Sequence, residues 1–172
     1  MFKTLASAAG IMLAASTAAF AHATIDAKEA SIGSSVRIAA RIPHGCDGTP
    51  TNVVRIRVPE GFIAVKPMPK AGWELEIVNG TYETSYQYHG ATLTEGVREI
   101  AWKGGELLDE HYDEFVLRGT VADTLEAGRT MYFPIVQECG DAAERWIEIP
   151  AEGQDPHSLE FPAPGMKIVP KG

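Results

Sequence analysis

Apolar and polar residues alternate along much of the chain. In residues 36–42 the apolar positions are Val36, Ile38, Ala40 and Ile42. A period of two sends successive side chains to opposite faces, so this segment predicts a half-buried strand with Arg37 and Arg41 facing water. The pattern recurs in residues 54–58, 73–77 and 115–121, and further strands are expected at 82–88, 97–102, 130–137 and 145–149. No segment sustains the 3.6-residue apolar period of a helix.

Turn-forming residues separate these runs. They occur in residues 44–48, 59–61, 79–80, 103–105 and 126–128, and a short helical turn fits between Gly104 and Glu114. Eight or nine short strands between residues 22 and 150 predict an all-β fold, a sandwich of two antiparallel sheets in a single domain. Residues 151–172 contain four spread prolines and are expected to form an extended strap or a loose tail.

Residues 1–21 have the pattern of a secretory signal. Lys3 is followed by an apolar run from Leu5 to Phe20 and by the small-residue ending Ala19-Phe20-Ala21. Cleavage after Ala21 would place the protein in the periplasm or outside the cell. We expect no membrane span in the processed chain, because no later apolar run reaches roughly 20 residues.

The processed chain is acidic. Lys3 is the only charged residue of the leader, so 14 basic side chains remain against 23 acidic ones, a formal charge of −9. Nucleic acids and anionic lipids are bound by basic surfaces, so this charge argues against both as partners.

Cys46 and Cys139 are the only cysteines. In an oxidising compartment two cysteines most simply form one disulfide, although reactive thiols or copper(I) ligands are alternatives. Closing a loop of this length would stabilise the fold by roughly 4 kcal/mol in the chain-entropy account.

Cleavage after Ala21 would make His22 the first residue. The α-amine and ring Nδ1 of a terminal histidine can close a chelate ring around a metal ion, and two nitrogen donors suit copper(II). The alternative is an arbitrary residue left by the signal peptidase. The other histidines, His44, His89, His111 and His157, match no zinc spacing and are expected at the surface.

Trp146 lies in the alternating run from Glu144 to Pro150. Its phase is opposite to that of Ile147 and Ile149. If those isoleucines face the core, the indole faces outward, which requires an explanation.

Several short motifs together resemble the YcnI-like family of secreted bacterial copper-binding domains. The resemblance covers nearly all of residues 22–150, and it rests on His22-Ala-Thr-Ile with Lys28-Glu29, Pro43-His-Gly-Cys-Asp-Gly, Lys66-Pro-Met-Pro-Lys, Gly72-Trp, Tyr112-Asp-Glu-Phe, Tyr132-Phe-Pro-Ile-Val-Gln and Arg145-Trp-Ile-Glu-Ile-Pro.

The resemblance implies an immunoglobulin-like β-sandwich that binds one copper(II) ion through a single-histidine brace. The family's site residues fall on His22, Glu29 and Trp146, and Trp146 would shield one side of the ion without a short bond. A straight strand would separate His22 and Glu29 by about 23 Å, so the segment between them must bend. Asp26 is closer in sequence and is an alternative ligand. Asp26-Ala27 also stands where relatives often have proline.

These observations favour a copper chaperone or buffer that exchanges the ion with another copper-trafficking protein, and not an enzyme. One rival is a copper-dependent oxidative enzyme, whose histidine brace would take a second histidine that matches no motif here. The other rival is a secreted interaction domain that binds no metal.

Overall fold

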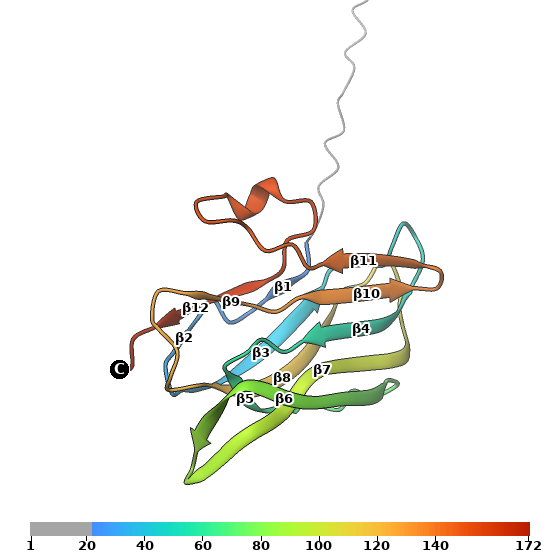
Figure 1. Cartoon of the computed structure of the whole chain (residues 1–172). Helices are drawn as coiled ribbons and strands as arrows, with labels where there is room; N and C mark the ends of the chain where they lie inside the picture. The colour runs from blue at the N-terminus through green and yellow to red at the C-terminus, as the bar shows by residue number, and fades with distance from the viewer. Residues whose placement is uncertain (1–21) are drawn as a thin grey trace, which may run out of the picture.

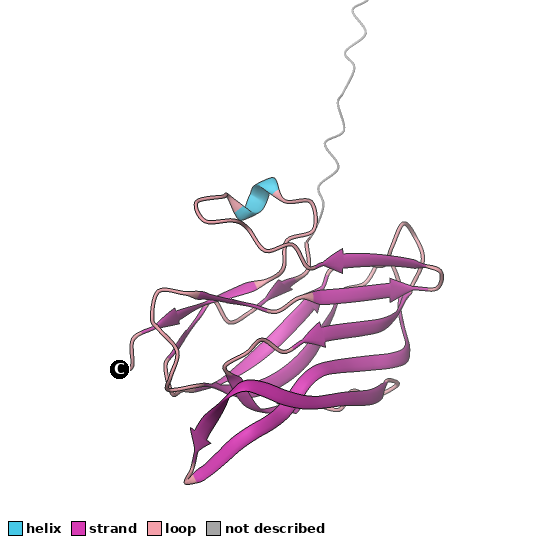
Figure 2. Cartoon of the chain, viewed as in Figure 1, coloured by secondary structure: helices cyan, strands magenta, loops and turns pink. Residues whose placement is uncertain are grey.

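The computed structural model describes residues 22–172, and all structural statements below concern those residues. The expected leader and its cleavage after Ala21 lie outside them. The described residues form twelve strands and one 3-10 turn, η1 (Pro156–Ser158). The all-β prediction is therefore confirmed, and Figure 2 shows η1 as the one helical element drawn. Among the described residues no helix has the length and apolar character needed to cross a membrane.

Two antiparallel sheets form the sandwich (Figure 1). One has the order β1 (Thr24–Ile25), β3 (Ser35–Ile42), β8 (Asp113–Val121) and β5 (Phe62–Pro67). The other has the order β11 (Ala142–Trp146), β10 (Ile135–Cys139), β4 (Thr51–Arg57), β7 (Ala91–Leu107) and β6 (Glu74–Tyr88).

The core lies between these two sheets. The alternation in residues 36–42 puts Ile38, Ala40 and Ile42 inward, each fully buried, while Arg37 and Arg41 are exposed. The facing sheet supplies Val54, Ile56, Ile100, Trp102 and Ile135 to the same cluster. Burial of these side chains is the dominant stabilising term for such a sandwich.

A third, smaller sheet closes one side of the molecule. It has the order β2 (Glu29–Ser31), β12 (Gly165–Val169) and β9 (Thr130–Tyr132), with β12 parallel to β2 and antiparallel to β9. Met166 and Ile168 of β12 are almost fully buried. Residues 165–169 are therefore packed into the fold as a strap, whereas nearly all of residues 151–160 are exposed.

The long β6–β7 hairpin differs from the expected short strands. A turn was expected at Asn79-Gly80, but both residues lie within β6 and continue its pairing with β7 past an irregularity in register. The chain reverses instead at His89-Gly90, whose φ values of 47° and 81° are those that a two-residue hairpin turn requires. Pairing along the whole hairpin overrides the local turn preference of Asn-Gly.

Lys103-Gly104-Gly105 is likewise a strand segment and not a turn. The register between β4 and β7 shifts beside it, and Gly104 has a φ of 74°. A side chain at Gly105 would overlap the ring of Trp73, which packs edge-on against Phe115 at 4.9 Å. The glycines therefore let β7 bulge around an aromatic pair. Between Gly104 and Glu114, where a short helical turn was conceivable, β7 first runs on to Leu107. A single turn follows, in which the His111 N–H donates to the Leu108 carbonyl at 3.1 Å, and no helix forms there.

Candidate metal centre

His22 lies two residues before the start of β1. Two inward side chains fix this end of the chain, since Ala23 and Ile25 are 3% and 1% exposed and β1 pairs with β3. The imidazole of His22 is half-buried, and no hydrogen bond or ion pair engages it within residues 22–172. Rigid backbone and a free ring are what a ligand position needs.

Trp146 ends β11 and lies against His22. The two ring centroids are 5.7 Å apart with an interplanar angle of 54°, although the residues are distant in sequence. The structure therefore brings together two of the three residues that the resemblance implies.

The outward orientation considered for Trp146 is wrong. The indole is 1% exposed, whereas Ile147 and Ile149 are 44% and 58% exposed. The inward phase of β11 belongs to Trp146, and the isoleucines follow the end of the strand, where the chain has left the sheet.

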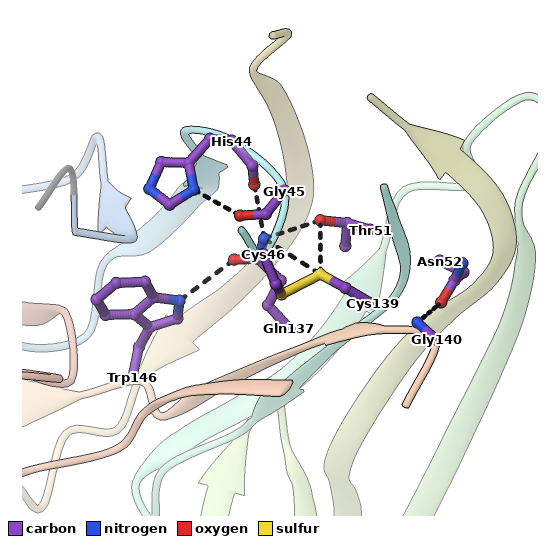
Figure 3. Close-up of a disulfide and its surroundings, with 9 residues drawn as sticks. All are labelled: His44, Gly45, Cys46, Thr51, Asn52, Gln137, Cys139, Gly140 and Trp146. Atoms are coloured by element: carbon purple, nitrogen blue, oxygen red, sulfur yellow. Dashed lines mark hydrogen bonds between the residues drawn. A yellow bond between two sulfur atoms is a disulfide. The ribbon is translucent and has the colours of Figure 1, made fainter. Parts of the chain in front are cut away.

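A hydrogen bond fixes the plane of this indole (Figure 3). The indole N–H donates to Gln137 Oε1 at 3.3 Å. The Gln137 amide in turn donates to the carbonyl of His44 at 2.6 Å and to the hydroxyl of Thr51 at 2.8 Å. The indole nitrogen is therefore already used, so Trp146 can offer His22 only its apolar ring.

The Cys46–Cys139 disulfide borders this network (Figure 3). The predicted bridge is present, with a Cα–Cα distance of 5.9 Å, and Thr51 Oγ1 lies 3.6 Å from Cys139 Sγ. Gln137, which the sequence analysis did not single out, was detectable in principle, because it shares the inward phase of Ile135 and Cys139 in β10.

A hollow of about 400 Å³ opens beside His22. Its polar lining includes His22, Lys28, Thr130, Tyr132 and His157. His157 was expected to be an ordinary surface residue. It is exposed, but it faces the same hollow as His22, and no spacing in the sequence signals this because the two lie at opposite ends of the chain.

Lys28 brings the only cationic side chain to the lining of this hollow. Its ammonium donates to the carbonyl of Ile25 at 2.8 Å. The charge is therefore directed toward a backbone oxygen at the β1 side.

The two candidate carboxylates lie elsewhere. The chain bends between β1 and β2, as the spacing required, and Asp26 lies at the bend. Its carboxylate accepts hydrogen bonds from the backbone N–H groups of Ala27 and Ala39. It also forms an ion pair with Arg37 at 2.7 Å. Glu29 is exposed on β2 in register with Lys167 and does not line the hollow.

The donor set fits copper(II) only in part. No three His, Cys, Asp or Glu side chains gather into a metal cluster within residues 22–172. Residue 22 is preceded by Ala21 in the full chain, so its nitrogen is an amide, and the second nitrogen donor arises only on cleavage. The imidazole and hollow are in place, while the amine depends on processing.

Glu144, two positions before Trp146 on the same face of β11, has an unusual environment. One carboxylate oxygen is buried without a hydrogen-bond partner. Burial raises the pKa of this carboxyl, the nearby His44 lowers it, and Asp47 and Asp109 raise it further. His44 Nδ1 in turn lies 2.5 Å from the carbonyl oxygen of Gly45.

Comparison with known proteins gives the family. Residues 22–168 match the family described as a domain of unknown function, DUF1775, which is the family known as YcnI-like. The chain belongs to this family. The match extends past residue 150, in agreement with the packed C-terminal strap of this YcnI-like protein. No curated protein matches the chain.

Solved structures show the fold class. An uncharacterized protein from Nocardia farcinica with an immunoglobulin-like fold matches at 19% identity and a TM-score of 0.63, covering 86% of this chain and 98% of its own. A cohesin module from a Clostridium perfringens family 33 glycoside hydrolase matches at 13% identity and a TM-score of 0.49, covering 87% and 97%. The match to the Nocardia farcinica protein confirms the immunoglobulin-like sandwich for this YcnI-like chain.

Proposed function

We propose that this YcnI-like protein, after cleavage at Ala21, binds one copper(II) ion at His22 in the periplasm or outside the cell. The amine and Nδ1 of His22 supply the first two donors. The protein acts as a chaperone or buffer that exchanges copper with another trafficking protein and not as an enzyme. A site with few protein donors leaves positions open for an incoming ligand, which suits exchange.

The observation that supports this proposal most strongly is the position of the His22 ring. It lies 5.7 Å from a buried tryptophan, lines an open hollow and has no hydrogen-bond partner among the described residues. Histidines held for structure are normally hydrogen-bonded, whereas a metal ligand needs a free ring nitrogen. The buried indole, hydrogen-bonded to Gln137, packs against the His22 ring on the side of the protein interior.

The third donor is the least constrained part of the proposal. Glu29 remains the carboxylate that the family pattern implies, and binding would require its side chain to turn toward His22. Asp26 is the weaker alternative, because two backbone N–H groups and Arg37 already use its carboxylate. Glu29→Gln should alter the electron paramagnetic resonance spectrum of bound copper(II), and Asp26→Asn should leave it unchanged.

The test is a copper(II) titration of the exported, processed protein, followed by electron paramagnetic resonance. We expect one saturable ion per chain. A matched variant with one alanine before His22 should lose most of the affinity, since it moves the free amine away from the ring. Equal affinity in both proteins would contradict the proposal.

One observation favours the oxidative-enzyme alternative, namely that His157 brings a second imidazole to the hollow of His22. This alternative is tested by incubating the copper-loaded protein with ascorbate, peroxide and polysaccharides. We expect no oxidised sugar products. Product formation that requires both histidines would establish the alternative.

A further inference from the structure

We propose that His157 is a second imidazole ligand of the copper(II) ion bound at His22. The inference rests on the proposed function and deepens it, because it names a donor that the sequence does not indicate. The ligand is supplied by the His157 loop, which we define as residues 147–164. This loop carries η1 and connects β11 to β12.

The first argument is position. His22 and His157 line the same hollow of about 400 Å³. Figure 1 shows the His157 loop beside the point where the described chain begins. A hollow of this size, comparable to small-ligand pockets, has room for an ion and its waters.

The second argument is that the base of the loop is anchored to the metal centre. The backbone N–H of Glu148 donates to the carbonyl of Phe161 at 3.0 Å, and the N–H of Ala163 donates to the carbonyl of Glu148 at 2.8 Å. The Phe161 ring lies 5.3 Å from that of Trp146. Trp146 therefore packs against both His22 and the loop, and this fixes the loop relative to His22.

The third argument concerns the tip of the loop. The backbone N–H groups of His157 and Ser158 donate to Asp155, at 2.9 Å and 3.0 Å. Pro156 further restricts the backbone between them. No hydrogen bond within residues 22–172 uses the imidazole of His157. The main chain of His157 is held and its ring is free.

The chemistry fits the ion. Copper(II) favours imidazole and amine nitrogen, so the amine, His22 and His157 would form a three-nitrogen set. Neither Glu29 nor Asp26 lines the hollow, so His157 is the side chain there best suited to complete it. Because His157 belongs to a solvent-exposed loop, its ring can leave the ion without unfolding the sheet, which provides a route for transfer.

The test measures how many imidazoles bind the copper(II) ion. Pulsed electron paramagnetic resonance detects the remote ring nitrogen of each histidine bound to copper(II), and a competition titration gives the affinity. The processed wild type is compared with His157→Gln and with the control His89→Gln, which alters the turn at the end of the β6–β7 hairpin. His157 is exposed, so its replacement should leave the fold intact, and circular dichroism verifies this.

We expect two imidazoles in the wild type and in His89→Gln, and one in His157→Gln, with the dissociation constant of His157→Gln raised about tenfold or more. One imidazole in the wild type and an unchanged His157→Gln would overturn the inference and leave the proposed function standing. Absence of saturable binding in the wild type would overturn both.

Discussion

Trp146 contacts two polar regions, and these differ in how their polar groups are used. On the disulfide side, Gln137 and Thr51 are fully buried and hydrogen-bonded to each other, to His44 and to the indole. On the hollow side, the rings of His22 and His157 are accessible and carry no hydrogen bond within the described residues.

This difference distinguishes side chains that stabilise the fold from side chains that could bind a ligand. A buried network whose members are all paired stabilises one conformation, and its residues have no capacity left for a ligand. Free imidazoles beside a hollow contribute little to folding and keep their donor capacity. Trp146 contacts both regions, because its N–H donates to Gln137 in the first and its buried ring packs against His22 of the second.

The largest expected effect is on the disulfide side. Replacing Cys46 and Cys139 together by serine should lower the free energy of unfolding by about 4 kcal/mol, since the bridge restrains a long loop in the unfolded chain. Urea unfolding measures the change. A double variant as stable as the wild type would show that the bridge does not support this region.

Gln137→Met should have the next largest effect. The change removes the Gln137 partner of the indole N–H and of the His44 carbonyl, and it leaves the Thr51 hydroxyl only its contact with Cys139 Sγ. It should cost about 2–3 kcal/mol in the free energy of unfolding. Asn52→Ala is the control, because it removes only an exposed bond to the Gly140 N–H. Equal losses in the two variants would contradict the importance of the buried network.

Glu144 supplies a smaller, pH-dependent effect. The pKa of the Glu144 carboxyl is raised, mainly by burial. Below the ordinary carboxyl pKa the group is protonated in both the folded and the unfolded state, so it does not affect stability. Above the raised pKa the folded protein carries a poorly solvated charge, which lowers its stability. Glu144→Gln should therefore add a few tenths of a kcal/mol of stability at about pH 8 and nothing at about pH 4, because solvent screens a half-buried group. Thermal unfolding at the two pH values measures this. A gain at the acid value only would reverse the sign and refute the account.

The sequence predicted the fold class well because two-residue periodicity is a local signal. Ile38, Ala40 and Ile42 faced the core as expected. Asn79-Gly80 failed as a turn because its place in the long hairpin depends on pairing with β7, which local preference does not encode.

The candidate site was only partly predictable. The family pattern indicated His22 and Trp146, which the structure places together, and it also indicated Glu29, which does not line the hollow. The phase of Trp146 differs from the expected one because Ile147 and Ile149 lie beyond the end of the strand and do not continue its alternation. His157 was missed because its approach to His22 comes from the path of the loop that leads to β12.

The central claim, that copper binds beside Trp146, is tested most directly by tryptophan emission. Trp102 is fully buried and donates to the carbonyl of Met68, and Trp73 packs against Phe115, so the structure gives neither a contact with His22. One equivalent of copper(II) should quench part of the emission of the processed protein. The quenched component should persist in Trp102→Phe and largely disappear in Trp146→Phe. Quenching that survives Trp146→Phe but vanishes in Trp102→Phe would place the ion elsewhere and contradict the account.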